Sequence, residues 1–270
     1  MVRLFEDART YQTPPEIHLP FWSFAIGGRV ERPRIFTYDE LQALPQRTIV
    51  NTIICAGAPF DTQLWEASEW HGVPAALLLR EIARLPGAMF AEITNARGYK
   101  TSLPLQALEE AIIAFEKDGA PLAPDDGFPA RLIVPGRYGY KQPRWLTHIA
   151  LRDAPSGFWE DRGWPLDGLM PALAAFDQPR LTAALNQPVR LSGYLSGGAR
   201  GSSGIALRAD GGPWMPMMID AAPGHSTQWS ATWMPPAAGS YALEVCPVES
   251  AGQPWPTSDR LHQTIVRVLQ

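Results

Sequence analysis

Prolines recur along the whole chain and place the strongest limit on its fold. There are 27 of them in 270 residues. Each proline fixes its own backbone φ and lacks an amide donor, so it interrupts helices and interior strands. The sequence therefore predicts many loops and turns and few long helices. Apolar residues make up 46% of the chain, which is enough for a sizeable core in two domains or one large one.

Charge and short motifs argue against several classes of function. The formal net charge is −4, so no general basic field indicates a nucleic-acid partner. The sequence lacks the glycine-rich loops typical of dinucleotide and P-loop nucleotide sites. Cys55 and Cys246 are the two cysteines, and their wide separation suggests neither a disulfide framework nor a structural zinc site.

The N-terminal residues and the length of the apolar runs help to predict the cellular location of the protein. Residues 1–15 lack the apolar core of an export signal and a twin-arginine pattern. No apolar run approaches the roughly 20 residues of a membrane span. We expect a cytoplasmic protein, or a periplasmic or membrane-associated one if a leader has been trimmed.

Hydrophobic patterning divides the chain into two parts. Apolar, β-branched segments predict strands at 22–30, 48–54, 89–94, 131–134 and 146–151. Helical spacing predicts helices at 38–44, 75–85 and 108–114, the first with the capping-box spacing of Thr37 and Glu40. From residue 179, short strands separated by Gly and Pro turns indicate a sandwich. The prediction is an α+β fold, with a mixed α/β domain over 1–178 and an all-β domain over 179–270.

Residues 127–146 form the most informative segment. An apolar strand runs into a turn at Pro135 and Gly136, and cations and aromatics then alternate. The cations are Arg137, Lys141 and Arg144, and the aromatics are Tyr138, Tyr140 and Trp145. Backbone amides and cations on such a loop could cradle an anion. The alternative is a basic surface loop that Trp145 anchors to the core.

The same segment resembles one found in sulfite oxidase-type molybdopterin enzymes, and further segments with that resemblance follow in the expected order. They are residues 70–78, 98–105, 114–122, 157–164 and 204–214. The resemblance covers about residues 20–265. It implies a molybdopterin-binding domain followed by an immunoglobulin-like domain of the kind often called the dimerisation domain, and hence a homodimer or a subunit of a larger complex.

The resemblance implies a molybdenum–molybdopterin cofactor with Cys55 as the metal ligand. Cys55 ends a predicted strand, 15 residues before Trp70. A thiolate is a soft, anionic ligand suited to a high-valent oxo-metal, and the pterin sulfurs supply further ligands. Without the resemblance, Cys55 would be interpreted as a small buried hydrophobe.

Further site residues are carried over from the family's motifs. Tyr99 matches a tyrosine beside the metal, where a phenol can donate to an oxo ligand or a substrate. The residues expected at the pterin are Thr94, Arg131, Arg137, Lys141, Gln142 and Arg144. The alternatives are a packing aromatic for Tyr99 and solvated charges for the cations.

The chain also departs from the family's pattern. The N-terminal loop that reaches the pterin in relatives is shortened around residues 13–20. Asp126 stands where the family has His or Asn, and Arg97 stands where it has Asp. Phe115 and Lys117 replace Tyr and Met. A carboxylate at position 126 would repel a nearby phosphate or anionic substrate.

Two functions therefore remain open. The first is a molybdenum–pterin oxidoreductase that transfers an oxygen atom on a small oxyanion or S-oxide-like substrate. It would exchange electrons with a cytochrome, a membrane haem protein or a quinone-linked partner. The second is a non-catalytic descendant that has lost the cofactor and serves as a binding or assembly subunit. Retention of Cys55 and Tyr99 favours the first, whereas Asp126 and the shortened loop favour the second.

Overall fold

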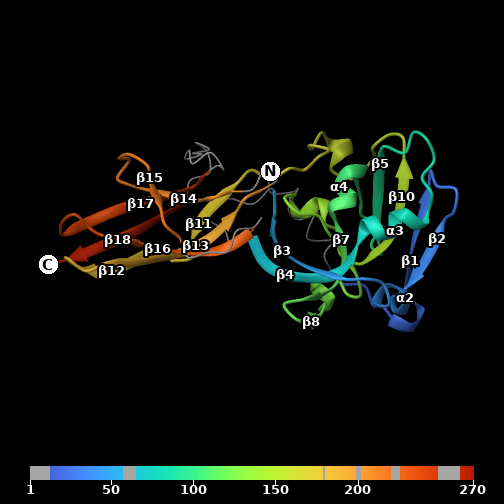
Figure 1. The fold of residues 1–270 in the computed structure, drawn as a ribbon, viewed down its shortest axis with the longest axis horizontal. Helices are drawn as coiled ribbons and strands as arrows, with labels where there is room; N and C mark the ends of the chain where they lie inside the picture. The colour runs from blue at the N-terminus through green and yellow to red at the C-terminus, as the bar shows by residue number, and fades with distance from the viewer. Residues whose placement is uncertain (1–12, 57–64, 179, 199–201, 220–225, 249–261) are drawn as a thin grey trace. The chain divides into compact units, whose positions relative to one another are not determined.

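The computed structural model describes residues 13–56, 65–178, 180–198, 202–219, 226–248 and 262–270 (Figure 1). The chain forms two compact units, and the division between their main parts falls between Leu169 and Met170. The predicted division at residues 178 and 179 lies within the second of them. Each unit has its own hydrophobic core.

One mixed sheet lies in the first unit, in the order β2-β1-β10-β5-β6 (Figure 1). Its strands are β2 (Arg34–Thr37), β1 (Ser23–Gly28), β10 (Leu146–Arg152), β5 (Phe90–Asn95) and β6 (Lys100–Pro104). β1 runs parallel to β10, and the other pairs are antiparallel. The loop between β5 and β6 contains Tyr99.

A second sheet of the first unit has the order β3-β4-β7-β8, and β9 also pairs with β7. Its strands are β3 (Arg47–Ile54), β4 (Trp65–Pro74), β7 (Ile112–Lys117), β8 (Ala120–Pro121) and β9 (Arg131–Ile133). Cys55 directly follows β3. A Cβ atom on Gly72 of β4 would lie 2.1 Å from the Ile113 carbonyl oxygen, so glycine is needed for the β4–β7 approach.

The helices of the first unit are short, as the proline content predicts. The α-helices are α2 (Tyr38–Gln42), α3 (Ala75–Glu81) and α4 (Leu105–Glu110). Thr37 and Glu40 form the predicted capping box at the start of α2. Single 3₁₀ turns are η1 (Leu19–Phe21), η2 (Pro124–Asp126), η3 (Gly139–Lys141) and η4 (Glu160–Arg162).

The helix predicted over 108–114 is wrong in its second half. α4 ends at Glu110, and the apolar run from Ile112 forms β7. Ile112 and Ile113 are fully buried and pair with β4 on one side and β9 on the other. A short run buried on both faces looks alike in a helix and in a central strand, and the β-branched residues favour the strand.

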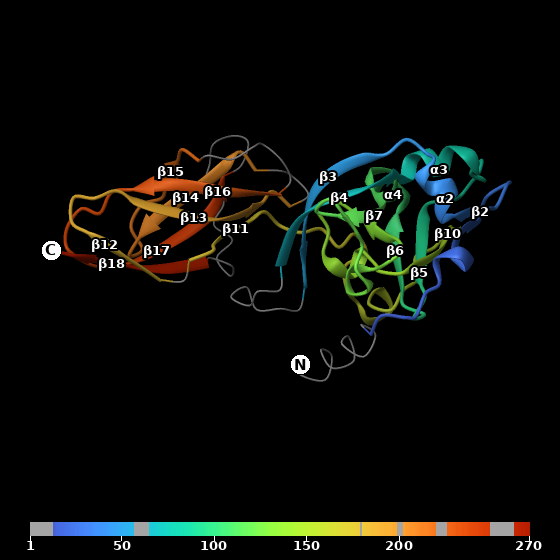
Figure 2. The same ribbon diagram turned by 90° about the horizontal axis from the view of Figure 1, so that it is seen from below.

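The second unit is a β-sandwich, as predicted (Figures 1 and 2). One sheet contains β11 (Leu173–Phe176), β13 (Val189–Ser196) and β16 (Ser226–Trp233). The other has the order β12 (Arg180–Ala184), β18 (His262–Leu269), β17 (Gly239–Val248), β14 (Gly204–Ala209) and β15 (Met215–Met217). Side chains from both sheets, such as Trp229 and Val266, share one core. Among the described residues, no helix is long and apolar enough to span a membrane.

Candidate cofactor site

The structure brings the end of β3, directly before Cys55, against the η3 turn that carries Lys141. Cys55 is an exposed free thiol at the end of β3. Gly139, the first residue of η3, packs against the last residues of that strand. A Cβ atom added to Gly139 would lie 3.1 Å from Ile53 Cγ2 and 3.4 Å from the Ile54 carbonyl oxygen. Residues more than 80 positions apart thus meet next to Cys55 in the chain, and the role of Cys55 as a metal ligand stays a prediction.

Tyr99 is joined to the same turn. Its phenol donates a hydrogen bond to the Tyr140 carbonyl oxygen at 2.6 Å. The loop holding Tyr99 is shaped by Asn95, whose side-chain oxygen accepts from the amides of Arg97 and Tyr99 at 2.9 and 3.0 Å. Burial, followed by the negative charge of Glu160, raises the pKa of Tyr99 well above its ordinary value. The phenol therefore keeps its proton at physiological pH and acts as a donor.

Gln142 is a fully buried junction at the end of η3. Its side-chain oxygen accepts from Asn51 Nδ2 at 3.0 Å and from the Val134 amide at 3.2 Å. Its Nε2 donates to the Arg137 carbonyl oxygen at 2.6 Å. Its side chain therefore fixes the turn to β3, and its backbone carbonyl accepts from Arg131 Nε at 3.2 Å. Asn51 has no motif signal in the sequence, and its role is visible only in the fold.

Arg131 and Lys117 lie on one buried indole. Their charged groups are 5.2 Å and 5.6 Å from the Trp70 ring centroid. Arg131 also donates to the Asp126 carbonyl oxygen at 3.2 Å. Lys117 donates to Asp126 Oδ1 at 2.9 Å. The carboxylate that was expected to repel an anion therefore has a cation of its own beside it.

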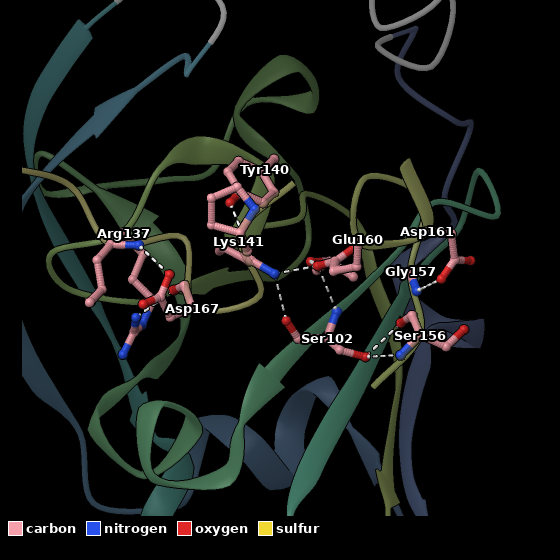
Figure 3. A network of polar contacts seen from close by, with 12 residues as sticks. Ser102, Arg137, Tyr140, Lys141, Ser156, Gly157, Glu160, Asp161 and Asp167 are labelled. Atoms are coloured by element: carbon pink, nitrogen blue, oxygen red, sulfur yellow. Dashed lines mark hydrogen bonds and ion pairs between the residues drawn. The ribbon is translucent and has the colours of Figure 1, made fainter. Parts of the chain in front are cut away.

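The remaining predicted cations occupy three different environments. Arg144 donates to the Asp125 carbonyl oxygen at 2.7 Å and stacks on Trp145. Arg137 donates to the Asp167 carbonyl oxygen, and burial lowers the pKa of its guanidinium. Lys141 is fully buried and forms an ion pair with Glu160 (Figure 3). Lys141 thus meets a carboxylate of the chain, which the sequence did not indicate.

Thr94 and Arg97 are placed by backbone contacts. The Thr94 carbonyl oxygen accepts from Thr147 Oγ1 at 3.0 Å, which ties β5 to β10. The Arg97 side chain donates to the carbonyl oxygens of Thr13 and Pro14 at 3.0 and 3.1 Å. Arg97, one of the departures from the family's pattern, therefore holds the shortened N-terminal segment against the β5–β6 loop.

The side chains at this site offer the kinds of ligand and hydrogen-bonding atom that a molybdenum–pterin group requires. Cys55 offers one accessible thiolate ligand. Two buried polar atoms near the turn, Asn51 Oδ1 and Arg137 Nε, have no hydrogen-bond partner among the described residues. Such atoms are rare in folded proteins and suit a bound polar group. Among the described residues, no cluster of three or more His, Cys, Asp and Glu side chains could hold a metal.

A protein-family model described as an oxidoreductase molybdopterin-binding domain matches residues 11–159. Two bacterial relatives match the chain over a similar length. The uncharacterized oxidoreductase YuiH of Bacillus subtilis (strain 168) is 28% identical over 152 residues, which are 54% of this chain and 74% of that protein. A putative protein-methionine-sulfoxide reductase subunit, YedZ1 of Azospira oryzae, is 29% identical over 55% of this chain and 56% of that protein.

A plant relative and a solved structure extend the comparison. Inducible nitrate reductase [NADH] 1 of Glycine max is 29% identical over 54% of this chain, but the match spans only 20% of that longer protein. The crystal structure of the sulfane dehydrogenase SoxCD from Paracoccus pantotrophus superposes with a TM-score of 0.78 at 23% identity, covering 91% of this chain and 72% of that one. The predicted fold is thus confirmed, and the chain belongs to the sulfite oxidase-type family of oxidoreductases with a molybdopterin-binding domain.

Proposed function

We propose that the chain binds a molybdenum–pterin cofactor through Cys55 and catalyses oxygen-atom transfer on a small oxyanion or S-oxide-like substrate. One observation supports the proposal: the η3 turn packs against Ile53 and Ile54, directly before the exposed Cys55, and the Tyr99 phenol is hydrogen-bonded to that same turn. When bound, the cofactor would supply a two-electron metal centre that accepts or donates an oxygen atom. The chain's residues would hold it and its substrate.

The binding roles are those carried over from the family's motifs. Cys55 would be the metal ligand. Arg131, Arg144, Arg137 and Gln142, with Thr94 on β5, would contact the pterin and its phosphate. Lys141 is neutralised by Glu160, so its contribution would be to the shape of the turn rather than to its charge. The ion pair of Lys117 with Asp126 removes the repulsion that the carboxylate alone would create.

Tyr99 would act as a hydrogen-bond donor to a substrate oxygen. Its raised pKa keeps the phenol protonated at neutral pH, so it can donate a hydrogen bond while its phenolate is too scarce to act as a base. In the structure the phenol donates to a carbonyl of the η3 turn, and donation to a substrate oxygen would replace that hydrogen bond. Donors of this kind stabilise negative charge that develops on oxygen during transfer.

The reaction requires a partner that carries electrons. Reduction of an S-oxide to a sulfide consumes two electrons and two protons and releases one water. A cytochrome, a membrane haem protein or a quinone-linked subunit would supply the electrons. The name of the relative from Azospira oryzae, a reductase subunit, is consistent with work inside such a complex. A homodimer formed through the β-sandwich stays a prediction, as does the cellular location.

A non-catalytic role is the second candidate. Arg131, Arg144 and Arg137 all donate to carbonyl oxygens of the chain itself, at Asp126, Asp125 and Asp167. A site that has lost its cofactor would be stabilised by such internal contacts. In that case the chain would serve as a binding or assembly subunit.

Turnover separates the two candidates. The protein is produced in a host that makes the cofactor and is assayed with reduced viologen against nitrate, dimethyl sulfoxide and methionine sulfoxide. We expect turnover of at least one acceptor, its loss in Cys55→Ser, and its retention in the matched variant Cys246→Ser, whose cysteine lies in β17 of the second unit. Lack of turnover with every acceptor, or equal turnover in Cys55→Ser, would favour the non-catalytic role.

A further inference from the structure

Glu160 is the centre of a buried polar network beside the candidate site (Figure 3). Its side chain is 6% exposed. A single oxygen, Oε1, accepts hydrogen bonds from Thr101 Oγ1 at 2.5 Å, from the Ser102 amide at 3.1 Å and from Lys141 Nζ. Lys141 also donates to the Ser102 carbonyl oxygen at 2.7 Å. One carboxylate thus joins β6, η3 and η4.

Two glycines make space for the side chains of the Lys141–Glu160 ion pair. A Cβ atom on Gly157 would lie 2.2 Å from Glu160 Oε2, and one on Gly168 would lie 2.5 Å from Lys141 Cγ. Burial lowers the pKa of Lys141, and the contact with Glu160 opposes that shift. Moving two charges out of water costs free energy, so a buried pair is weak support for stability, and in some proteins it fixes geometry.

The geometry that this pair fixes is the contact of Tyr99 with the η3 turn. Thr101 and Ser102 follow Tyr99 by two and three residues along the chain. Lys141 directly follows Tyr140, whose carbonyl oxygen accepts the Tyr99 phenol. Glu160 therefore bonds to both sides of the Tyr99–Tyr140 contact. The same turn packs against Ile54, the residue before Cys55.

Tyr140 is held from its other end as well. Its phenol donates to the Pro165 carbonyl oxygen at 2.7 Å, and its ring meets Trp164 edge to face at 5.1 Å. The backbone carbonyl that faces Tyr99 consequently has little freedom. Two anchors, one at the Tyr140 side chain and one at Lys141, keep it in place.

We propose that Glu160, acting with Lys141, is a positioning residue that sets the Tyr99 phenol against the η3 turn beside Cys55. This inference rests on the proposed function only in giving Tyr99 a catalytic purpose. The positioning itself is a property of the chain and can be measured without the cofactor. If the pair only stabilised the fold, removing it would lower stability and leave the Tyr99 phenol bonded to the Tyr140 carbonyl oxygen.

The test measures the phenol directly. The full chain, with tyrosines labelled at Cζ with ¹³C, is studied by NMR, and the Tyr99 signal among the seven tyrosines is assigned by its loss in Tyr99→Phe. The Cζ chemical shift of a tyrosine depends on the hydrogen bond of its phenol. We expect Glu160→Gln to move the Tyr99 signal. Asp161→Asn, which changes the exposed neighbouring carboxylate, should leave that signal in place.

A second variant guards against loss of folding. Glu160→Gln leaves the Lys141 charge buried and uncompensated, whereas Lys141→Met combined with Glu160→Gln removes both charges at similar volume. The double variant loses the Lys141 bond to Ser102 and should also move the Tyr99 signal. An unchanged Tyr99 signal in either folded variant would overturn the inference.

Turnover gives an independent readout. If Glu160 acts through Tyr99, Glu160→Gln should lower kcat by up to about a hundredfold, as a misplaced group can. It should lower kcat little further when Tyr99→Phe is already present. Additive losses in the two variants would overturn the positioning role. A wild-type protein without turnover would count against the proposed function alone, because the NMR result stands without it.

Discussion

Lys117 donates a hydrogen bond from Nζ to Oδ1 of Asp126 at 2.9 Å, and both side chains are largely buried. Each residue replaces the one that the family's pattern leads us to expect. The ammonium also lies within 5.6 Å of the Trp70 ring centroid, which the guanidinium of Arg131 approaches to 5.2 Å. Two departures that look independent along the sequence are therefore partners in space, and the charge of Asp126 is balanced inside the fold.

Breaking this pair should destabilise the protein. Asp126→Asn leaves Lys117 without its carboxylate, and we expect a loss of about 1–2 kcal/mol in the free energy of unfolding, between the values for exposed and fully buried pairs. Urea denaturation measures the loss. Asp125→Asn, at the exposed neighbouring position, should change stability by less than about 0.5 kcal/mol. If Asp126→Asn and Lys117→Met proved additive in the double variant, the two side chains would not be interacting.

Arg97 should control the order of the N-terminal segment. Arg97→Ala removes both hydrogen bonds to the carbonyl oxygens of Thr13 and Pro14. We expect faster amide hydrogen exchange and faster proteolysis around residues 13–18, while the core strands keep their protection. Arg32→Ala, at another exposed arginine, should leave these rates unchanged. Equal exchange in Arg97→Ala and wild type would contradict the role assigned to Arg97.

Tyr99 should make stability depend on alkaline pH. Because the pKa of Tyr99 is higher in the folded chain than in the unfolded one, the folded state holds its proton more tightly. The contribution of the protonated Tyr99 phenol to the free energy of unfolding is fully present below about pH 10, the pKa of tyrosine in an unfolded chain. It is lost as the pH rises from there through the higher pKa of Tyr99 in the folded chain. Above pH 10 the stability of wild type should fall relative to that of Tyr99→Phe by up to about 1.4 kcal/mol per pH unit.

Near pH 7 we expect wild type to be the more stable of the two proteins. Tyr99→Phe loses the hydrogen bond to Tyr140, which is worth about 1 kcal/mol. Urea denaturation of both proteins from pH 7 to about pH 11 gives the difference at each pH. Other buried tyrosines are common to the two proteins and cancel in that difference. A difference that does not change with pH would show that the phenol is not shielded from water.

Gly72 should be essential to the pairing of β4 with β7. A Cβ atom there would lie 2.1 Å from a backbone oxygen that cannot rotate away. We expect Gly72→Ala to cost about 3 kcal/mol, at the upper end for overpacking. In Gly27→Ala the nearest atom would be His148 Nε2 at 3.7 Å, an ordinary contact, so the cost should stay below about 1 kcal/mol. Thermal unfolding compares the two, and equal stabilities would contradict the β4–β7 geometry.

The sequence predicted the parts of the fold that local patterns determine. The capping box at Thr37, the strand that ends before Cys55 and the C-terminal sandwich are all present, because turns, caps and short strands leave local patterns, although the sandwich already begins with β11 at Leu173. The helix predicted over 108–114 failed because Ile112 and Ile113 form a strand between two partners that are distant in sequence. Burial on both faces is decided by tertiary pairing, which a single segment does not encode.

The motif series predicts that Cys55, Tyr99 and the cations share one site, and their roles toward a cofactor stay a prediction. The structure shows that the end of β3 and the Tyr99 phenol both contact the η3 turn. The partner of Lys141 could not be predicted, because Glu160 stands 19 positions further along and carries no local signal for that pairing. Asn51 was missed for the same reason. Such contacts depend on how β3, η3 and η4 pack.

Metal analysis of the purified chain, produced in a host that makes the molybdenum–pterin cofactor, tests whether Cys55 holds molybdenum. We expect molybdenum and pterin in stoichiometric amounts with the wild-type chain and with Cys246→Ser. We expect molybdenum to be lost in Cys55→Ser, because that variant removes the thiolate ligand. Wild-type protein that is free of molybdenum, or Cys55→Ser protein that retains it in full, would rule out Cys55 as the ligand of a bound metal.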